Sequence, residues 1–84
     1  MSRKEKLLSR LLSRPADFQW REACALMRQC GFEVHNRDGS RRMFRNANTR
    51  QKVSLHEPHG GEALKPYALD DLINALKDAG EIDE

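Results

Sequence analysis

The chain has 84 residues, of which 38% are hydrophobic and 33% charged, and its formal net charge is +2. This length fits one domain, residues 1–84, and the hydrophobic content is too high for a fully disordered chain. No apolar run approaches the ~18 residues of a membrane span. The charged N-terminus lacks the apolar core of a signal peptide. We therefore expect no membrane partner and a cytoplasmic location.

The charges are distributed unevenly along the chain. Residues 1–65 hold 14 basic and 7 acidic residues, whereas residues 66–84 hold 1 basic and 6 acidic residues. A basic body followed by an acidic end favours a phosphate-bearing partner for the body. Ordinary solvated surface is the alternative explanation.

The first predicted element is a short helix within residues 1–14 that ends before Pro15. Its leucines recur at helical spacing between basic residues: Leu7, Leu8, Leu11 and Leu12. We expect this stripe to pack on the domain as an additional N-terminal helix. A basic amphipathic helix lying on a membrane is the alternative.

A second helix is predicted from about Trp20 to Cys30, with Gly31 as its C-terminal stop. Ala23, Met27 and Cys30 mark its expected buried stripe, with Leu26 beside it. Cys24 and Cys30 would lie about 9 Å apart along the helix axis and on different sides, which exceeds the usual reach of a disulfide. The sequence therefore predicts two reduced thiols.

Three short runs with strand-like alternation follow, at residues 32–37, 41–45 and 51–56. Phe32 and Val34 alternate with Glu33 and His35 in the first run. The segment "DGS" at residues 38–40 is a hairpin signal, and "NANT" at residues 46–49 is a second turn. The pattern predicts a three-stranded antiparallel meander.

The last helix is expected from about residue 68 to 79, with Gly80 at its end. Leu69, Leu72, Ile73 and Leu76 have the spacing of one apolar face. Asp70 and Asp71 are expected in its first turn, where the helix dipole favours acids. The element order predicts an α+β fold with helices on one face of the sheet and the other face open.

The open face is the first candidate site. If Phe44 points inward, Arg42 shares its side, whereas Arg41 and Arg45 point outward. The other outward residues are expected to be His35, Arg37, Met43, Lys52, Ser54 and His56. Six basic residues against one acid between Arg37 and Lys52 suit the phosphates of an A-form RNA helix. The absence of outward aromatics argues against a base-stacking sheet, and a solvated face that resists edge aggregation is the alternative.

The second candidate is the segment "HEPH", residues 56–59. RNA cleavage needs a base for the 2′-hydroxyl and an acid for the leaving oxygen, so His56 and His59 beside arginine are chemically sufficient. Two histidines and one carboxylate are too few for a zinc site, so we expect no metal. A role restricted to hydrogen bonding within the loop is the alternative. No nucleotide-binding loop or hydrolase motif is present.

Three segments together resemble the HicA family of toxins from type II toxin–antitoxin modules: "GSRRMF" (39–44), "VSLHEPH" (53–59) and "LKPYALDDLINALKDAG" (64–80). The resemblance covers residues 20–80. It implies a double-stranded-RNA-binding-like α-β-β-β-α core, cleavage of mRNA without a cofactor, and neutralisation by a HicB-type antitoxin. Gly39 and Ser40 correspond to the turn of the family motif and Phe44 to the core.

One departure from the family affects the predicted site. Better-known members carry a histidine within two residues after the Gly-Ser turn, where this chain has Arg41 and Arg42. We therefore take His56 and His59 as the candidate catalytic residues. The candidate RNA-binding residues are Arg37, Ser40, Arg41, Arg42, Arg45 and Lys52. A non-catalytic RNA-binding module and a protein-interaction domain remain the alternatives.

Overall fold

The computed structural model describes residues 2–82. Its helices are α1 (Arg3–Leu12), α2 (Trp20–Gln29), the 3-10 turn η1 (His59–Gly61) and α3 (Pro66–Asp78). Its strands are β1 (Phe32–Asn36), β2 (Arg41–Asn46) and β3 (Lys52–His56). The strands form one antiparallel sheet in the order β1-β2-β3. The predicted α+β class and the α-β-β-β-α order after an N-terminal helix are confirmed, and this order is consistent with a double-stranded-RNA-binding-like core.

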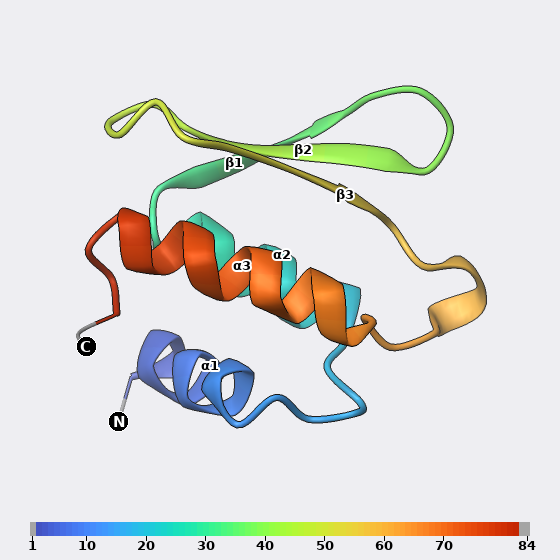
Figure 1. The fold of residues 1–84 in the computed structure, drawn as a ribbon, viewed down its shortest axis with the longest axis horizontal. Coiled ribbons are helices and arrows are strands. Elements are labelled where there is room, and N and C mark those ends of the chain that lie inside the picture. Colours follow the sequence, from blue (N-terminus) through green and yellow to red (C-terminus); the bar gives the residue numbers. More distant parts are fainter. Residues whose placement is uncertain (1, 83–84) are drawn as a thin grey trace.

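The elements lie in layers, with all the long helices on one side of the sheet (Figure 1). Helix α2 packs against β1 and α3 against β3, while α1 packs beneath both helices. No helix among residues 2–82 is long and apolar enough to cross a membrane. The second face of the sheet is left uncovered by helices, as the element order predicted.

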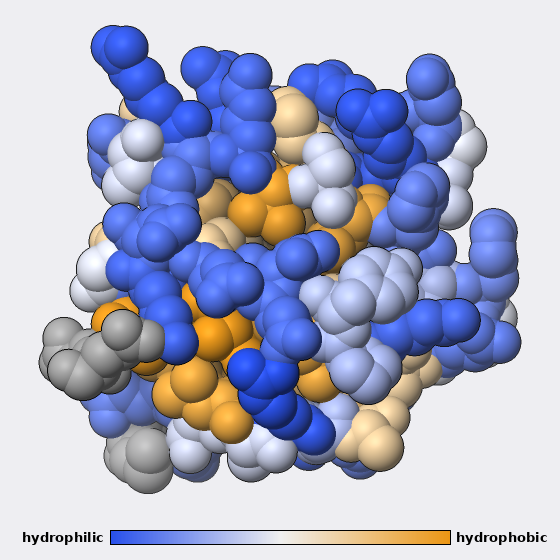
Figure 2. Space-filling view, viewed as in Figure 1, coloured by the Kyte–Doolittle hydropathy of each residue, from blue (hydrophilic) through white to orange (hydrophobic). Residues whose placement is uncertain are grey.

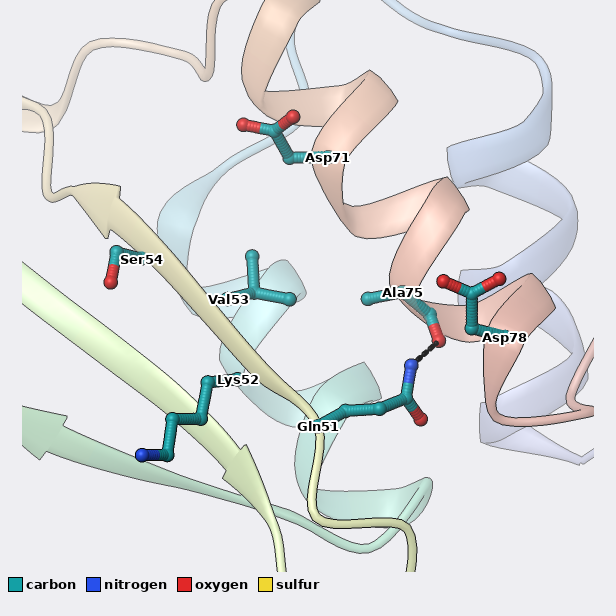
Figure 3. Close-up of a pocket in the computed structure, with 7 residues that line it drawn as sticks. All are labelled: Gln51, Lys52, Val53, Ser54, Asp71, Ala75 and Asp78. Carbon is teal, nitrogen blue, oxygen red and sulfur yellow. Dashed lines mark hydrogen bonds between the residues drawn. The ribbon is translucent and has the colours of Figure 1, made fainter.

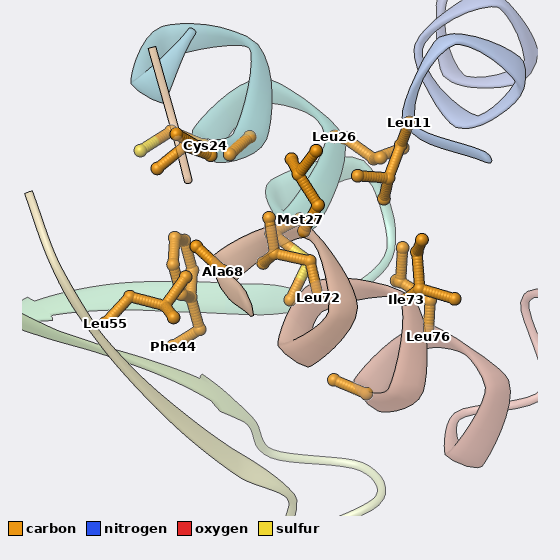
Figure 4. Close-up of a cluster of buried hydrophobic side chains, with 14 of the residues drawn as sticks. Leu11, Cys24, Leu26, Met27, Phe44, Leu55, Ala68, Leu72, Ile73 and Leu76 are labelled. Atoms are coloured by element: carbon orange, nitrogen blue, oxygen red, sulfur yellow. The ribbon is translucent and has the colours of Figure 1, made fainter. Parts of the chain in front are cut away.

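The hydrophobic core fills the space between the sheet and the helices (Figure 4). The largest side chains buried in it are Leu11, Phe18, Leu26, Met27, Phe32, Phe44, Leu72 and Leu76. The rings of Trp20 and Phe44 lie 5.4 Å apart at a tilted angle, which joins the start of α2 to the central strand. Cys24 and Cys30 are buried and free, as their spacing predicted.

In both turns of the sheet, the conformation and hydrogen bonds of individual residues explain why the chain reverses there. Gly39 has a φ of 55°, a conformation that residues with a Cβ adopt at a cost, and Asp38 accepts the turn hydrogen bond from the Arg41 amide at 2.9 Å. In the second turn, the buried Asn46 side chain accepts hydrogen bonds from the amides of Asn48 and Thr49. Both turns lie where the sequence predicted them.

An ion pair between Arg10 and Glu22 links helix α1 to the start of α2. Arg10 Nε donates to Glu22 Oε2 at 2.6 Å, and Arg10 also pairs with Asp17. Glu22 also accepts a hydrogen bond from the Gln19 amide, which completes a capping box at the start of α2. The stripe on α1 therefore packs on the domain, with Leu11 fully buried.

The prediction that Asp70 and Asp71 lie in the first turn of the last helix is wrong. Helix α3 begins at Pro66, about two residues earlier than expected, and its first turn holds no acid. Proline is favoured at the first helical position because its missing amide hydrogen would have no partner there. Asp70 instead forms an ion pair with Arg14.

Candidate nucleic-acid interface and catalytic residues

The strand register defines which side chains share the uncovered face of the sheet. Phe44 is buried and pairs with Val34 on one side and Val53 on the other, so these positions face the helices. The intervening positions face away: Glu33, His35, Arg41, Met43, Arg45, Lys52, Ser54 and His56. Arg37 follows directly after β1. This arrangement agrees with the outward set that the alternation predicted.

Four cations carry the positive charge of this face, and we call Arg37, Arg41, Arg45 and Lys52 the basic face. All four side chains are exposed. Arg45 lies directly opposite Lys52 on one side, where like charges repel, and opposite Glu33 on the other. In the described part of the chain, Arg41, Arg45 and Lys52 have no ion-pair partner, whereas Arg10, Arg14 and Arg42 do. Figure 2 shows hydrophilic side chains over the sheet and a hydrophobic band between the sheet and α3.

Arg42 differs from these cations in position and partners. It lies on the helix side of β2, where its Nε donates to Glu57 Oε1 at 3.2 Å. Its terminal nitrogen donates to the carbonyls of Gly39 and Arg41 at 2.8 and 2.9 Å. The structure therefore does not bring Arg42 together with the basic face. Its guanidinium instead holds the β1–β2 turn against the segment after β3.

His56 lies at the end of β3, directly opposite Arg41. Its Nδ1 is 3.3 Å from Ser40 Oγ, and the Ser40 carbonyl accepts a hydrogen bond from the Glu57 amide at 2.8 Å. Two contacts therefore hold the Gly-Ser turn beside the end of β3. Since Nδ1 is engaged, Nε2 is the ring nitrogen left for a substrate.

His59 lies in η1 and is exposed. It lines a hollow of about 280 Å³ together with His56 and Ser40. The remaining lining residues are Glu57, Pro58, Glu62, Ala63, Leu64, Lys65, Tyr67 and Ala68. The structure thus brings both predicted histidines and the predicted serine to one place. In Figure 1 the β1–β2 turn, the end of β3, η1 and the start of α3 all lie at the same end of the molecule.

Tyr67 and Lys65 line this hollow but were not among the candidate site residues predicted from the sequence. Tyr67 follows Lys65-Pro66 at the start of α3 and is 57% exposed, off the buried stripe of that helix. An aromatic side chain outside the apolar stripe was the available signal. It was overlooked because the helix was expected to begin after it.

Lys52 also lines a different hollow, of about 350 Å³, between β3 and α3 (Figure 3). The other lining residues are Gln51, Val53, Ser54, Asp71, Ala75 and Asp78. Gln51 closes one side of it by donating to the Ala75 carbonyl at 2.9 Å. This hollow contains neither of the candidate histidines. Among residues 2–82, no three His, Cys, Asp or Glu side chains are placed to hold a metal ion.

The described residues form a small α+β domain. One face of its antiparallel sheet is not covered by helices and carries exposed cations. The family model described as HicA toxin of bacterial toxin-antitoxin matches residues 20–81, from the start of α2 to just beyond α3. The chain therefore belongs to the HicA toxin family, and it is the toxin of a toxin–antitoxin module whose partner is an antitoxin. Helix α1 lies outside the matched residues. No curated protein and no solved structure matches the chain.

Proposed function

We propose that the protein is an endoribonuclease that binds mRNA on the basic face and cleaves it beside His56. The observation that carries the proposal is the pairing of Arg41 with His56 across the β2–β3 ladder, next to the contact between His56 and Ser40. Side chains directly opposite in such a ladder have Cβ atoms about 4.5–5.5 Å apart. A phosphate held by Arg41 therefore lies within reach of the imidazole.

The chemistry needs one proton acceptor and one proton donor. When Nδ1–H of His56 donates to Ser40 Oγ, the lone pair of Nε2 is free to accept the proton of the RNA 2′-hydroxyl. The 2′-oxygen then attacks phosphorus, and the bond from phosphorus to the 5′-oxygen breaks. Protonated His59, on the same hollow, supplies the proton to that leaving oxygen. The products are a 2′,3′-cyclic phosphate and a free 5′-hydroxyl.

Charge on the phosphate grows as the attacking oxygen bonds to phosphorus. Arg41 is placed to stabilise that charge because its planar guanidinium donates two parallel hydrogen bonds to phosphate oxygens. Arg37, Arg45 and Lys52 then hold the flanking backbone. In this scheme Arg42 acts as a positioning residue, since its hydrogen bonds go to Glu57 and to the turn.

His56 lies next to the position at which this chain departs from the motif of the HicA family. This chain has Arg41 and Arg42 just after the Gly-Ser turn, where the resemblance to better-known HicA members implies a histidine. His56 lies on the neighbouring strand directly opposite Arg41, so an imidazole is available beside that position. We propose that a HicB-type antitoxin neutralises the protein by covering the basic face and His56.

The test uses purified protein and His56→Ala protein prepared identically, so that contaminating nuclease is detected. Both are incubated with an mRNA and with the same RNA carrying 2′-O-methyl groups. The proposal expects cleavage of the unmodified RNA only, by the unaltered protein only, with 2′,3′-cyclic phosphate ends. RNA binding without cleavage products at any pH would instead identify a non-catalytic RNA-binding protein. Equal cleavage by both proteins would remove His56 from the mechanism.

A further inference from the structure

Tyr67 is the most exposed large apolar side chain in the described part of the chain. It is 57% exposed, and Leu12, at 44%, is the other large apolar residue in this class. Tyr67 lies one residue into α3, whereas the buried stripe of that helix begins at Ala68. Packing of the fold therefore gives no reason for an aromatic ring at this position.

Tyr67 lines the hollow together with His56 and His59. Four further lining residues are apolar: Pro58, Ala63, Leu64 and Ala68. The volume of about 280 Å³ lies just below the ~300–1,000 Å³ of pockets for drug-sized ligands. A single planar ring system fits such a space better than a longer ligand.

The charges of the hollow indicate which part of a nucleotide would enter it. Glu62 and Lys65 line it, together with Glu57, whose charge is compensated by its ion pair with Arg42. The lining thus carries no excess of positive charge for a phosphate, whereas carboxylates and an ammonium group are suitable partners for the donors and acceptors on a base edge. The basic face outside the hollow takes the phosphates, and the interior suits an uncharged ring.

We propose that this hollow binds one unpaired nucleobase next to the scissile phosphate, and that the base stacks on Tyr67. This inference rests on the proposed ribonuclease function and adds the structural class of its substrate. A base in a duplex is stacked between its neighbours and cannot enter the hollow. The cleaved position therefore lies in a loop, a bulge or a single strand, and the backbone on either side runs along the basic face.

The test measures binding and needs no cleavage, so it is independent of the catalytic step. A fluorescently labelled single-stranded RNA 12-mer of mixed sequence is compared with a 12-mer that lacks the bases at its four central positions. The 2′-hydroxyls of both are methylated to prevent cleavage. Both are titrated with unaltered protein, Tyr67→Ala, Tyr67→Phe and the control Leu12→Ala, in which an exposed apolar residue on α1 is removed.

The unaltered protein is expected to bind the complete RNA about 5- to 150-fold more tightly than the abasic RNA, the range that stacking of one base provides. Tyr67→Ala is expected to lose this preference and to bind both RNAs equally. Tyr67→Phe retains the ring and is expected to keep the preference, as is Leu12→Ala. Circular dichroism checks that all four proteins are folded.

Three outcomes would overturn the inference. If Tyr67→Ala keeps the full preference for the complete RNA, no base stacks on Tyr67, although the ribonuclease proposal would stand. If Tyr67→Ala binds both RNAs normally but binds the antitoxin more weakly, the hollow is a protein contact. If the unaltered protein binds neither RNA, the proposed function fails, and this inference fails with it.

Discussion

Ser40 Oγ and His56 Nδ1 lie 3.3 Å apart, although 16 positions separate the two residues in the chain. This contact fixes the orientation of the imidazole and engages one of its two nitrogens. When Nδ1–H donates to Ser40 Oγ, Nε2 carries the lone pair and can accept a proton, as the proposed role of His56 requires.

Removal of this imidazole tests its catalytic role. We expect His56→Ala to lower the rate of RNA cleavage about 10²- to 10⁴-fold, the range for loss of a general acid or base. Ser40→Ala is expected to lower it about 2- to 12-fold, the equivalent of one neutral hydrogen bond, and to alter the pH profile of the rate. Ser40→Thr, which keeps the hydroxyl, is expected to restore most of the activity.

The matched control for this prediction is His35→Ala. His35 lies on the same face of the sheet, and its Nε2 is 3.5 Å from Glu33 Oε2. We expect the rate of this variant to stay within about twofold of the unaltered protein, because His35 lies outside the proposed mechanism. Equal losses for His35→Ala and His56→Ala would mean that both act only by changing the fold.

Neutralising one cation of the basic face is expected to weaken RNA binding, and at Lys52 also to stabilise the fold slightly. Each of Arg45→Gln and Lys52→Gln removes one cation, so the slope of log affinity against log salt should fall by about 0.7–0.9. Lys52→Gln also relieves the repulsion between Arg45 and Lys52, so the Tm should rise by about 1–3 °C, whereas Arg45→Gln also removes the cation opposite Glu33 and should raise the Tm less. Arg21→Gln, which removes an exposed cation from α2, is the control and should change neither quantity.

The Arg10–Glu22 ion pair makes the stability of the protein depend on pH. The hydrogen bond from Arg10 lowers the pKa of Glu22 below its ordinary value of 4.5. A carboxylate with a lowered pKa in the folded state adds stability above its unfolded pKa and loses it as the pH falls through the folded pKa. We expect Glu22→Gln to be less stable than the unaltered protein at pH 5–7, with the difference shrinking below pH 4.5. A constant difference between pH 2 and 7, measured by urea unfolding, would contradict this.

The two buried thiols are expected to be unreactive in the folded protein. Burial raises the pKa of the Cys30 thiol to about 11 and also raises that of Cys24. At pH 8 about one Cys30 thiol in a thousand is then ionised, and only the thiolate attacks a disulfide reagent. An aromatic disulfide reagent should label two thiols per chain in strong denaturant and close to none in buffer. Rapid labelling in buffer would show that α2 opens readily.

Local patterns were sufficient to predict most of the fold. Alternation at Phe32 and Val34, the Gly39 turn and the leucine spacing of the last helix each depend on neighbours in the chain, and each is confirmed. The start of α3 was misplaced because the apolar stripe begins after Pro66, whereas the proline itself marks the first turn. Helix α3 begins at Pro66, since proline is favoured at the first helical position, and not at Ala68, where its buried stripe begins.

The candidate site was less predictable because its contacts join distant positions. The sequence placed Arg42 on the side of Phe44, but its hydrogen bond to Glu57, 15 positions away, depends on the turn and on β3 together. Tyr67 lines the same hollow as the histidines because the segment with η1 connects the end of β3 to the start of α3 at one end of the molecule (Figure 1). Such relationships depend on loop geometry, for which the residue pattern carries little signal.

The separation between the open sheet face and the helix-covered face has a practical consequence for producing the protein. A toxin is difficult to express because the host that makes it stops growing. Here the side chains proposed to bind and cleave RNA lie on the uncovered face of the sheet and around the hollow at its end, whereas the core lies between the sheet and the helices. Replacing the exposed ones should therefore yield a harmless, folded protein that can be made in quantity without its antitoxin, and that keeps helices α1 and α2 unchanged as attachment points for labels.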